Sequence, residues 1–140
     1  MKSDVLNYDV DDRICTITLN RPDNLNSFNH ALRMDMLTAL ETAEADDAVR
    51  VVIIKGAGKG FCAGADLAEG LERNIENELL TEYKPIMMAI QESRKPFIAQ
   101  CHGPVAGIGG GLAMACDMMF MDQGSYMRSE EHTSELQSHL

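Results

Sequence analysis

The sequence predicts an α/β fold, on the strength of three observations. Short β-branched runs alternate with stretches in which apolar residues recur at helical spacing. Two glycine-rich segments, 56–64 and 103–111, each follow a predicted strand and precede a predicted helix. The chain has 140 residues, the size of one ordinary domain, and no apolar run is long enough to span a bilayer.

The first third of the chain predicts a β-hairpin followed by a helix. Residues 5–10 and 13–19 are strand-like and flank a polar turn at Asp11 and Asp12. Residues 20–29 are rich in proline, aspartate and asparagine, which predicts a loop. Apolar residues of 30–45 recur every three or four positions, which predicts an amphipathic helix.

The rest of the chain continues the alternation. Residues 49–54 are a β-branched run suited to a buried strand. Asp66 and Glu69 resemble a capping box that starts a helix. A longer helical stretch covers 75–93, in which Pro85 predicts a break or kink. The remaining predicted elements are a strand at 97–101, a small-residue helix at 112–116 and a strand at 117–121.

The composition is acidic, with a formal net charge of -10 and a pI of about 4.7. We therefore expect no nucleic-acid partner, because phosphate backbones are bound by basic patches. A small anionic ligand is still compatible with this charge, because backbone N–H groups can bind it. The four cysteines form no C-x-x-C pair and indicate buried free thiols instead of a metal site. Because no signal peptide is recognisable, we expect a cytoplasmic protein without membrane association.

The two glycine-rich segments are the strongest candidates for ligand binding, since glycine lets a ligand approach the backbone closely. Neither segment matches a nucleotide-binding fingerprint. Phe61 and Leu112 stand where a third glycine is needed, and Lys59 is followed by Gly60 instead of serine or threonine. Spacing alone is equally compatible with two tight strand–helix connections that bind nothing.

The end of the sequence differs in character from the rest. All ten methionines fall within residues 1–127, and residues 128–140 have no periodic apolar face. These last residues resemble a common DNA sequencing adapter translated in one frame. We expect 1–127 to be a partial native domain and 128–140 a non-native tail, with a natural polar tail as the alternative.

Several motifs, in order and with matching spacing, resemble the crotonase family, also called the enoyl-CoA hydratase/isomerase family. The motifs are ITLNRP at 17–22, LN at 25–26, VRVV at 49–52, FCAGADL at 61–67, KP at 95–96 and GPVAGIGGGLAMACD at 103–117. The resemblance covers about 14–121 and corresponds to the N-terminal half of the family. It implies a crotonase-like ββα spiral core, truncated before the C-terminal helices.

The resemblance also implies an oxyanion hole for the thioester oxygen of an acyl-CoA, formed by the backbone N–H groups of Ala65 and Ile108. Donors that are held in place stabilise an enolate oxygen without reorganising. No metal or separate cofactor is expected, because coenzyme A is part of the substrate. The residues implied to line the substrate path are Leu25, Asn26, Ala63, Gly64, Ala65, Asp66, Leu67, Gly107 and Ile108.

Four polar side chains near these segments have two interpretations each. Asp66 is either a catalytic acid or the N-cap of the helix that follows it. His102 is either a general base or a residue bonded to its turn, and His30 has the same alternatives. Lys59 either meets a phosphate of coenzyme A or is a solvated loop lysine. We favour the second interpretation in each case.

One departure from the family pattern leaves the reaction open. Hydratases of the family use two glutamates, and Gly111 stands where the first is expected. The second would fall at about His132, inside the suspected tail. The missing acid argues against hydration by the two-glutamate route, and the GIGGG pattern resembles members that shift a double bond or open a ring on a CoA thioester. The function that the resemblance implies is therefore hydration or double-bond isomerisation of an enoyl-CoA in fatty acid metabolism, by a full-length homotrimer or hexamer. The alternatives are a non-catalytic acyl-CoA-binding homologue and an inactive truncated fragment.

Overall fold

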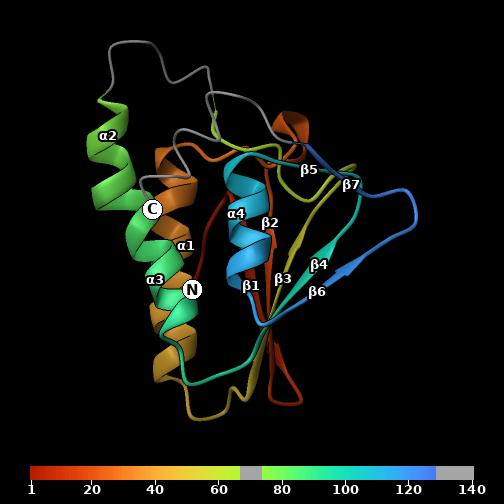
Figure 1. Ribbon diagram of the computed structural model, residues 1–140. Coiled ribbons are helices and arrows are strands. Elements are labelled where there is room, and N and C mark those ends of the chain that lie inside the picture. The colour runs from red at the N-terminus through yellow and green to blue at the C-terminus, as the bar shows by residue number, and fades with distance from the viewer. Residues whose placement is uncertain (67–73, 129–140) are drawn as a thin grey trace.

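The computed structural model describes residues 1–66 and 74–128, and its elements follow the predicted alternation (Figure 1). The strands are β1 (Leu6–Asp11), β2 (Ile14–Leu19), β3 (Val51–Gly56), β4 (Phe97–Cys101), β5 (Pro104–Ala106), β6 (Met118–Met121) and β7 (Tyr126–Arg128). The α-helices are α1 (His30–Ala45), α2 (Ile75–Glu78), α3 (Lys84–Gln91) and α4 (Ile108–Ala115). A 3₁₀ turn at Pro22–Asn24 and a π-helix at Leu79–Tyr83 complete the set.

Strands β1 and β2 form the predicted hairpin and pair antiparallel over their full length. The turn consists of Asp12 and Arg13, whose φ angles are 48° and 66°. Two successive positive φ values are the turn geometry that matches the twist of the flanking strands. The hairpin is confirmed, and its turn lies one residue later than the sequence predicts.

The main sheet has the strand order β1-β2-β3-β4-β6, and β2, β3, β4 and β6 run parallel. Helices α1, α3 and α4 lie on one side of it (Figure 1): α1 packs on β1 and β2, α4 packs on β4, and α3 contacts both helices. Because the strands are parallel, the loops that follow β2, β3 and β4 all begin at the same edge of the sheet. This shared edge brings together segments 20–29, 56–66 and 102–107.

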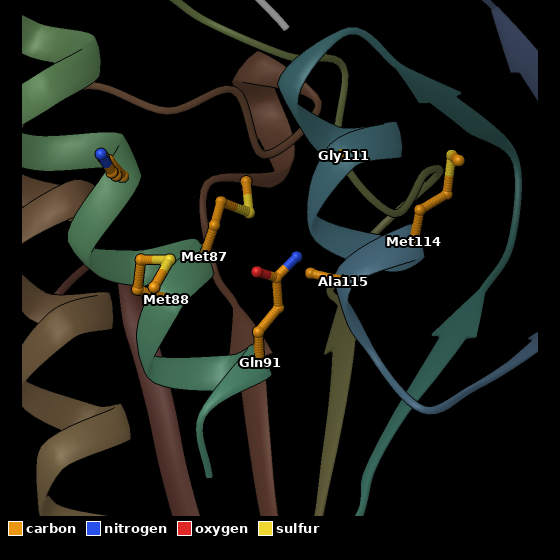
Figure 2. A pocket seen from close by; sticks show the side chains of 7 residues that line it. Met87, Met88, Gln91, Gly111, Met114 and Ala115 are labelled. Atoms are coloured by element: carbon orange, nitrogen blue, oxygen red, sulfur yellow. The ribbon is translucent and has the colours of Figure 1, made fainter. Parts of the chain in front are cut away.

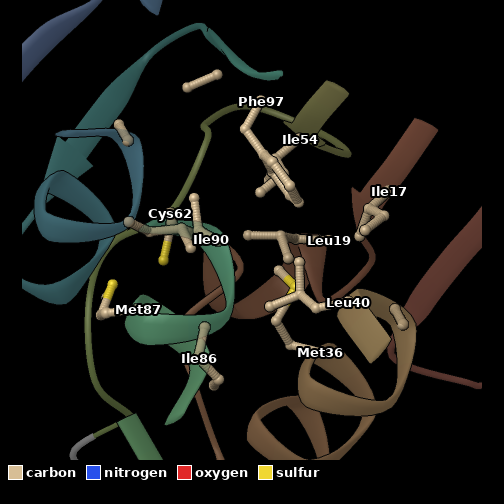
Figure 3. Close-up of a cluster of buried hydrophobic side chains, with 14 of the residues drawn as sticks. Ile17, Leu19, Met36, Leu40, Ile54, Cys62, Ile86, Met87, Ile90 and Phe97 are labelled. Atoms are coloured by element: carbon tan, nitrogen blue, oxygen red, sulfur yellow. The ribbon is translucent and has the colours of Figure 1, made fainter. Parts of the chain in front are cut away.

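The core fills the space between the sheet and these helices (Figure 3). Burial alternates along β2 and β3, so every second side chain faces the helices. Helix α1 turns a stripe at helical spacing towards the sheet, as its periodicity predicts. The core side chains labelled in Figure 3 are Ile17, Leu19, Met36, Leu40, Ile54, Cys62, Ile86, Met87, Ile90 and Phe97.

The predicted break at Pro85 is a π-helix that joins α2 to α3 without interrupting the helical path. Proline lacks the N–H that would complete the α-helical ladder one turn earlier. The wider π turn, Leu79–Tyr83, ends two residues before Pro85 and absorbs this mismatch. The sequence therefore predicts the position of the irregularity, and the structure defines its kind.

The second glycine-rich segment is more ordered than the predicted turn. It contains β5, and α4 begins at Ile108, four residues earlier than the predicted start at 112. Gly109 explains this difference, because a Cβ at that position would lie 2.5 Å from the carbonyl oxygen of Cys62. Gly109 therefore lets the helix backbone approach the loop at Cys62 closely, and it does not interrupt the helix. Strand β7, which pairs parallel with β5, was not predicted because three residues carry no periodicity.

Candidate functional site

Asn26 joins the loop after β2 to the loop after β3. Its side chain is fully buried, with the Oδ1 atom accepting from the Arg21 N–H at 2.8 Å. Its Nδ2 atom donates to the carbonyls of Ala57 and Gly60 at 2.8 and 2.9 Å. Its backbone N–H donates to Arg21, and its carbonyl accepts from the Cys62 thiol at 3.2 Å. The side chain and the backbone of Asn26 therefore both form hydrogen bonds inside the protein, and these bonds connect the two loops.

The two loops then run side by side as short extended segments. The Ala63 N–H donates to Leu25 at 2.9 Å, and the Phe28 N–H donates to Gly64 at 2.7 Å. The Asp66 N–H donates back to Phe28 at 2.9 Å. Four of the predicted substrate-lining residues thus belong to one hydrogen-bonded backbone unit. Leu25 has a left-handed φ of 51° and an exposed side chain at the edge of this unit.

The orientation of the Ala65 N–H follows from this pairing. The carbonyl of Gly64 and the N–H of Ala65 belong to one trans peptide group, so they point to opposite sides. Because that carbonyl accepts from Phe28, the Ala65 N–H points away from Phe28. Gly64 makes the necessary backbone turn with a φ of +111°, which favours glycine.

The Ile108 N–H lies at the first position of α4. The preceding carbonyl, that of Gly107, accepts from the Gly111 N–H at 3.2 Å and so points along the helix. The Ile108 N–H, in the same peptide group, therefore points out of the N-terminal end of α4. Gly107 is the N-cap residue, and its φ of 56° turns the chain into the helix.

The Ala65 and Ile108 segments are close neighbours. The Ala106 N–H donates to Cys62 at 3.0 Å, and a Cβ on Gly64 would lie 3.2 Å from the Ala106 carbonyl oxygen. Within residues 1–66 and 74–128, neither the Ala65 N–H nor the Ile108 N–H has a protein acceptor. Since most backbone donors in folded proteins are paired, two available donors on adjacent segments form a candidate anion-binding site.

Asp66 uses its side chain for an ion pair with Arg21, with Oδ2 lying 3.0 Å from Nη2. The helix that Asp66 was predicted to cap, and the predicted site residue Leu67, lie outside the described residues. Gly107 is buried, and its N–H donates to the carbonyl of Arg128 at 3.2 Å. Arg128 ends β7, while residues 129–140 also lie outside the described part, so the predicted tail stays a prediction.

The two histidines have structural partners. The Nε2 atom of His102 lies 2.7 Å from the carbonyl oxygen of Gly58, which bonds it to the neighbouring glycine-rich loop. This contact agrees with a histidine that is tied to a turn. The Nδ1 atom of His30 lies 2.7 Å from Oε1 of Glu82, a partner that the sequence did not reveal. Lys59 is exposed on its loop, in agreement with a solvated lysine.

A cavity of about 320 Å³ lies between α3 and α4. Met87 and Gln91 of α3 face Gly111 and Ala115 of α4 across it (Figure 2). Gly111, which lines the cavity, follows Ile108 by three positions, so the two residues lie on the same face of α4. The described residues that line it include no carboxylate: they are Lys84, Met87, Met88, Gln91, Gly111, Met114 and Ala115.

The cysteines are free, as predicted, and three of them are fully buried. Burial raises the pKa of Cys62 to about 12 and that of Cys101 to about 11. Burial likewise raises the pKa of the half-buried Cys116 to about 12. Thiols with such values stay protonated at neutral pH and are poor nucleophiles. Across the described ranges, no three His, Cys, Asp or Glu side chains gather as metal ligands, and no helix is long and apolar enough to cross a membrane.

Comparisons with known proteins bear on the family and the fold. The family model described as "Enoyl-CoA hydratase/isomerase" matches residues 9–133. A probable enoyl-CoA hydratase of Rhodobacter capsulatus is 33% identical over 89% of this chain and 49% of its own length. The 1,2-epoxyphenylacetyl-CoA isomerase of Escherichia coli is 34% identical over 79% of this chain and 44% of its own length.

A crystal structure of an enoyl-CoA hydratase from Mycobacterium smegmatis superposes with a TM-score of 0.83 at 32% identity, covering 88% of this chain and 49% of that one. The predicted crotonase-like α/β fold is thereby confirmed. The chain spans about half the length of the relatives it matches. The fold, the order of the motifs and the family match lead to one conclusion: this chain belongs to the enoyl-CoA hydratase/isomerase family.

Proposed function

We propose that the complete protein is an acyl-CoA-processing enzyme and that the N–H groups of Ala65 and Ile108 bind the thioester oxygen of its substrate. The observation that carries this proposal is the pair of available backbone donors on adjacent segments. The names of the relatives, which are hydratases and isomerases of CoA thioesters, supply the substrate class.

The chemistry requires stabilisation of negative charge on that oxygen. Removing a proton next to a thioester carbonyl, or adding water across a conjugated double bond, gives an enolate. Each fixed donor at such an oxygen is worth about 3 kcal/mol of transition-state stabilisation in other enzymes. The positive end of the α4 dipole adds to the effect, because the Ile108 N–H points out of the helix N-terminus.

We favour double-bond isomerisation over hydration. Gly111 occupies the position of an acid that hydratases use, and the described lining of the adjacent cavity contains no carboxylate. Its apolar methionines suit an acyl chain that extends from the thioester along α4. The group that moves the proton must then lie elsewhere in the complete protein, within hydrogen-bond reach of the substrate carbon.

The test replaces Ile108 with proline in the intact protein. Proline is tolerated at the first position of a helix and removes only an N–H that the helix does not use. We expect Ile108→Pro to lower kcat for isomerisation of a β,γ-enoyl-CoA about a hundredfold or more. Ile108→Ala, which keeps the N–H but loses the side chain, measures the contribution of the side chain. Equal activities of the two variants would remove Ile108 from the proposed site.

A non-catalytic acyl-CoA-binding protein is the competing function. An acyl-CoA that raises the melting temperature of the intact protein, with no measurable turnover of any enoyl-CoA, would favour it. An inactive fragment is the second alternative, and it predicts neither stabilisation nor turnover for the 140-residue chain.

We also propose the cofactor requirement, the assembly and the compartment of the enzyme. Coenzyme A enters as part of the substrate, so the proposed chemistry needs no separate cofactor. The family resemblance supports a homotrimer or hexamer that acts in fatty acid metabolism, and the free thiols support a reducing compartment such as the cytoplasm. Sedimentation of the intact protein tests the assembly directly.

A further inference from the structure

We propose that Arg21 is a positioning residue that orients and polarises the Ala65 N–H, an inference that rests on the proposed function. Arg21 lies in the loop after β2, and its guanidinium bonds Ser27 and Asp66. Its influence is carried by a chain of hydrogen bonds that starts at its guanidinium and ends at that amide.

The chain passes through two peptide groups. The Nη1 atom of Arg21 donates to the carbonyl oxygen of Ser27. The peptide group of that carbonyl carries the Phe28 N–H, which donates to Gly64 at 2.7 Å. The peptide group of Gly64 in turn carries the Ala65 N–H. Each trans peptide points its C=O and N–H in opposite directions, so the donors are aligned head to tail from Arg21 to Ala65.

This alignment gives the charge of Arg21 a path to the substrate oxygen. A cationic donor on the Ser27 carbonyl draws electron density through the peptide group and makes the Phe28 N–H a stronger donor. The same effect at the Gly64 carbonyl strengthens the Ala65 N–H. The polarisation is directed at the oxygen that becomes negative during the reaction, and the guanidinium itself never touches the substrate.

Asp66 holds the guanidinium in this position. Its Oδ2 atom lies 3.0 Å from Nη2 of Arg21, and the two side chains are only 12% and 13% exposed. The backbone of Arg21 is fixed as well, because its N–H donates to the buried Asn26 side chain. Asp66 is also bonded through its own N–H to Phe28. Arg21 therefore bonds a group on each side of the Ala65 peptide: the Ser27 carbonyl, whose peptide group bonds Gly64, and the side chain of Asp66.

The experiment compares Arg21→Lys and Arg21→Met in the intact protein. A lysine ammonium keeps the charge but lacks the planar fork that reaches Ser27 and Asp66 together. We expect kcat to fall about tenfold in Arg21→Lys and further in Arg21→Met, with a much smaller change in KM. Arg50→Met is the matched control, because Arg50 is exposed directly before β3 and, in the described part of the chain, has no side-chain partner.

A spectroscopic readout separates polarisation from a general loss of structure. Infrared difference spectra of a bound enoyl-CoA, ¹³C-labelled at the thioester carbonyl, report the strength of its hydrogen bonds. We expect wild-type protein to lower the carbonyl stretching frequency relative to free substrate, and the Arg21 variants to restore part of that shift. Asp66→Asn, which releases the guanidinium without removing it, should act in the same direction and serves if Arg21→Met does not fold.

Two results would overturn the inference and are distinguishable from each other. If folded Arg21→Lys and Asp66→Asn variants keep the wild-type kcat and carbonyl frequency, Arg21 has no part in positioning, and the proposed function stands. If the wild-type protein binds the thioester without lowering its carbonyl frequency, the site at Ala65 and Ile108 fails, and the inference fails with it.

Discussion

Asn26 illustrates how a single buried side-chain amide can hold two loops of a candidate site together. Its side chain makes three hydrogen bonds to the backbone of two different loops. Its φ of 56° lies in the left-handed region, which asparagine tolerates better than most residues. The resemblance implies that the backbone around Asn26 lines the substrate path, which stays a prediction, and the structure shows that the side chain binds the two loops together.

Asn26→Ala should destabilise the intact protein by about 3 kcal/mol, because it removes the partner of the buried Gly60 carbonyl and of the partly buried Ala57 carbonyl and Arg21 N–H. Asn7→Ala is the control, since Asn7 is exposed on β1 and should change the free energy of unfolding by less than about 0.5 kcal/mol. Urea denaturation of both variants measures the difference. Similar values for the two would show that the Asn26 bonds contribute little.

At the scale of elements, the docking of α4 on the first glycine-rich loop decides the position of the Ile108 amide. Gly109 faces Cys62 so closely that any side chain would overlap the Cys62 carbonyl. Gly110, its neighbour in the same helix, has room for a methyl group: a Cβ there would meet only the Met127 Cε atom, at 3.6 Å. These two glycines provide a matched pair within one turn of helix.

Gly109→Ala should push the start of α4 away from Cys62 and separate the Ile108 and Ala65 donors. A displacement of about 1 Å at a catalytic group lowers activity on the order of a hundredfold. We expect that loss in kcat for Gly109→Ala and close to wild-type activity for Gly110→Ala, measured by turnover of an enoyl-CoA. Equal activities would mean that α4 adjusts without moving the amide.

Another element-scale contact links α1 to the π-helix. Arg33 of α1 is 1% exposed, and its Nε atom lies 3.0 Å from Oε1 of Glu82. Its guanidinium also lies over the ring of Tyr83, 5.2 Å from the centroid, and bonds the Tyr83 hydroxyl. A buried arginine is stable only with such partners. The wider π turn places Glu82 and Tyr83 beside the start of α1.

At the scale of the whole molecule, the buried thiols link stability to alkaline pH. Unfolded thiols titrate near pH 8.5, whereas burial raises the pKa of Cys62 to about 12. Between these values the folded state retains a proton that the unfolded state releases. The contribution is therefore fully present below about pH 8.5 and is lost as the pH rises towards 12.

We expect the free energy of unfolding to fall by about 1.4 kcal/mol per pH unit for each such thiol above about pH 9. Cys62→Ala should reduce this slope, although it also changes the stability at neutral pH. Denaturation curves between pH 7 and 10 measure both quantities. A free energy that stays constant across this range in the wild-type protein would contradict the assigned burial.

The exposed apolar side chains of β6 are a second property of the whole molecule. All four residues of β6, Met118–Met121, are exposed, and β6 is the last strand of the main sheet. An apolar strand at a sheet edge favours association with other chains. We expect the 140-residue chain alone to self-associate, and Phe120→Lys to reduce the association more than Ala48→Lys, which changes an exposed position before β3. Light scattering at increasing concentration measures this, and a strictly monomeric wild-type chain would contradict it.

The hairpin, α1, β4 and the position of the helix irregularity at Pro85 could be predicted because their signals are local. Alternating or helical periodicity and proline chemistry act over a few neighbouring residues. The family, too, could be recognised from the sequence, since its motifs occur in order along the chain. The start of α4 was missed because a run of glycines indicates a turn unless the partner that requires close contact is known.

The amino-acid sequence by itself determined the alternation of strands and helices and the residues at which the candidate donors lie. Only the tertiary structure decided which way those donors point, because a peptide orientation depends on its hydrogen-bond partner. The partner of Gly64 is Phe28, and the neighbour of Gly109 is Cys62. Such pairs are far apart in the chain and meet only because parallel strands place their loops at one edge of the sheet.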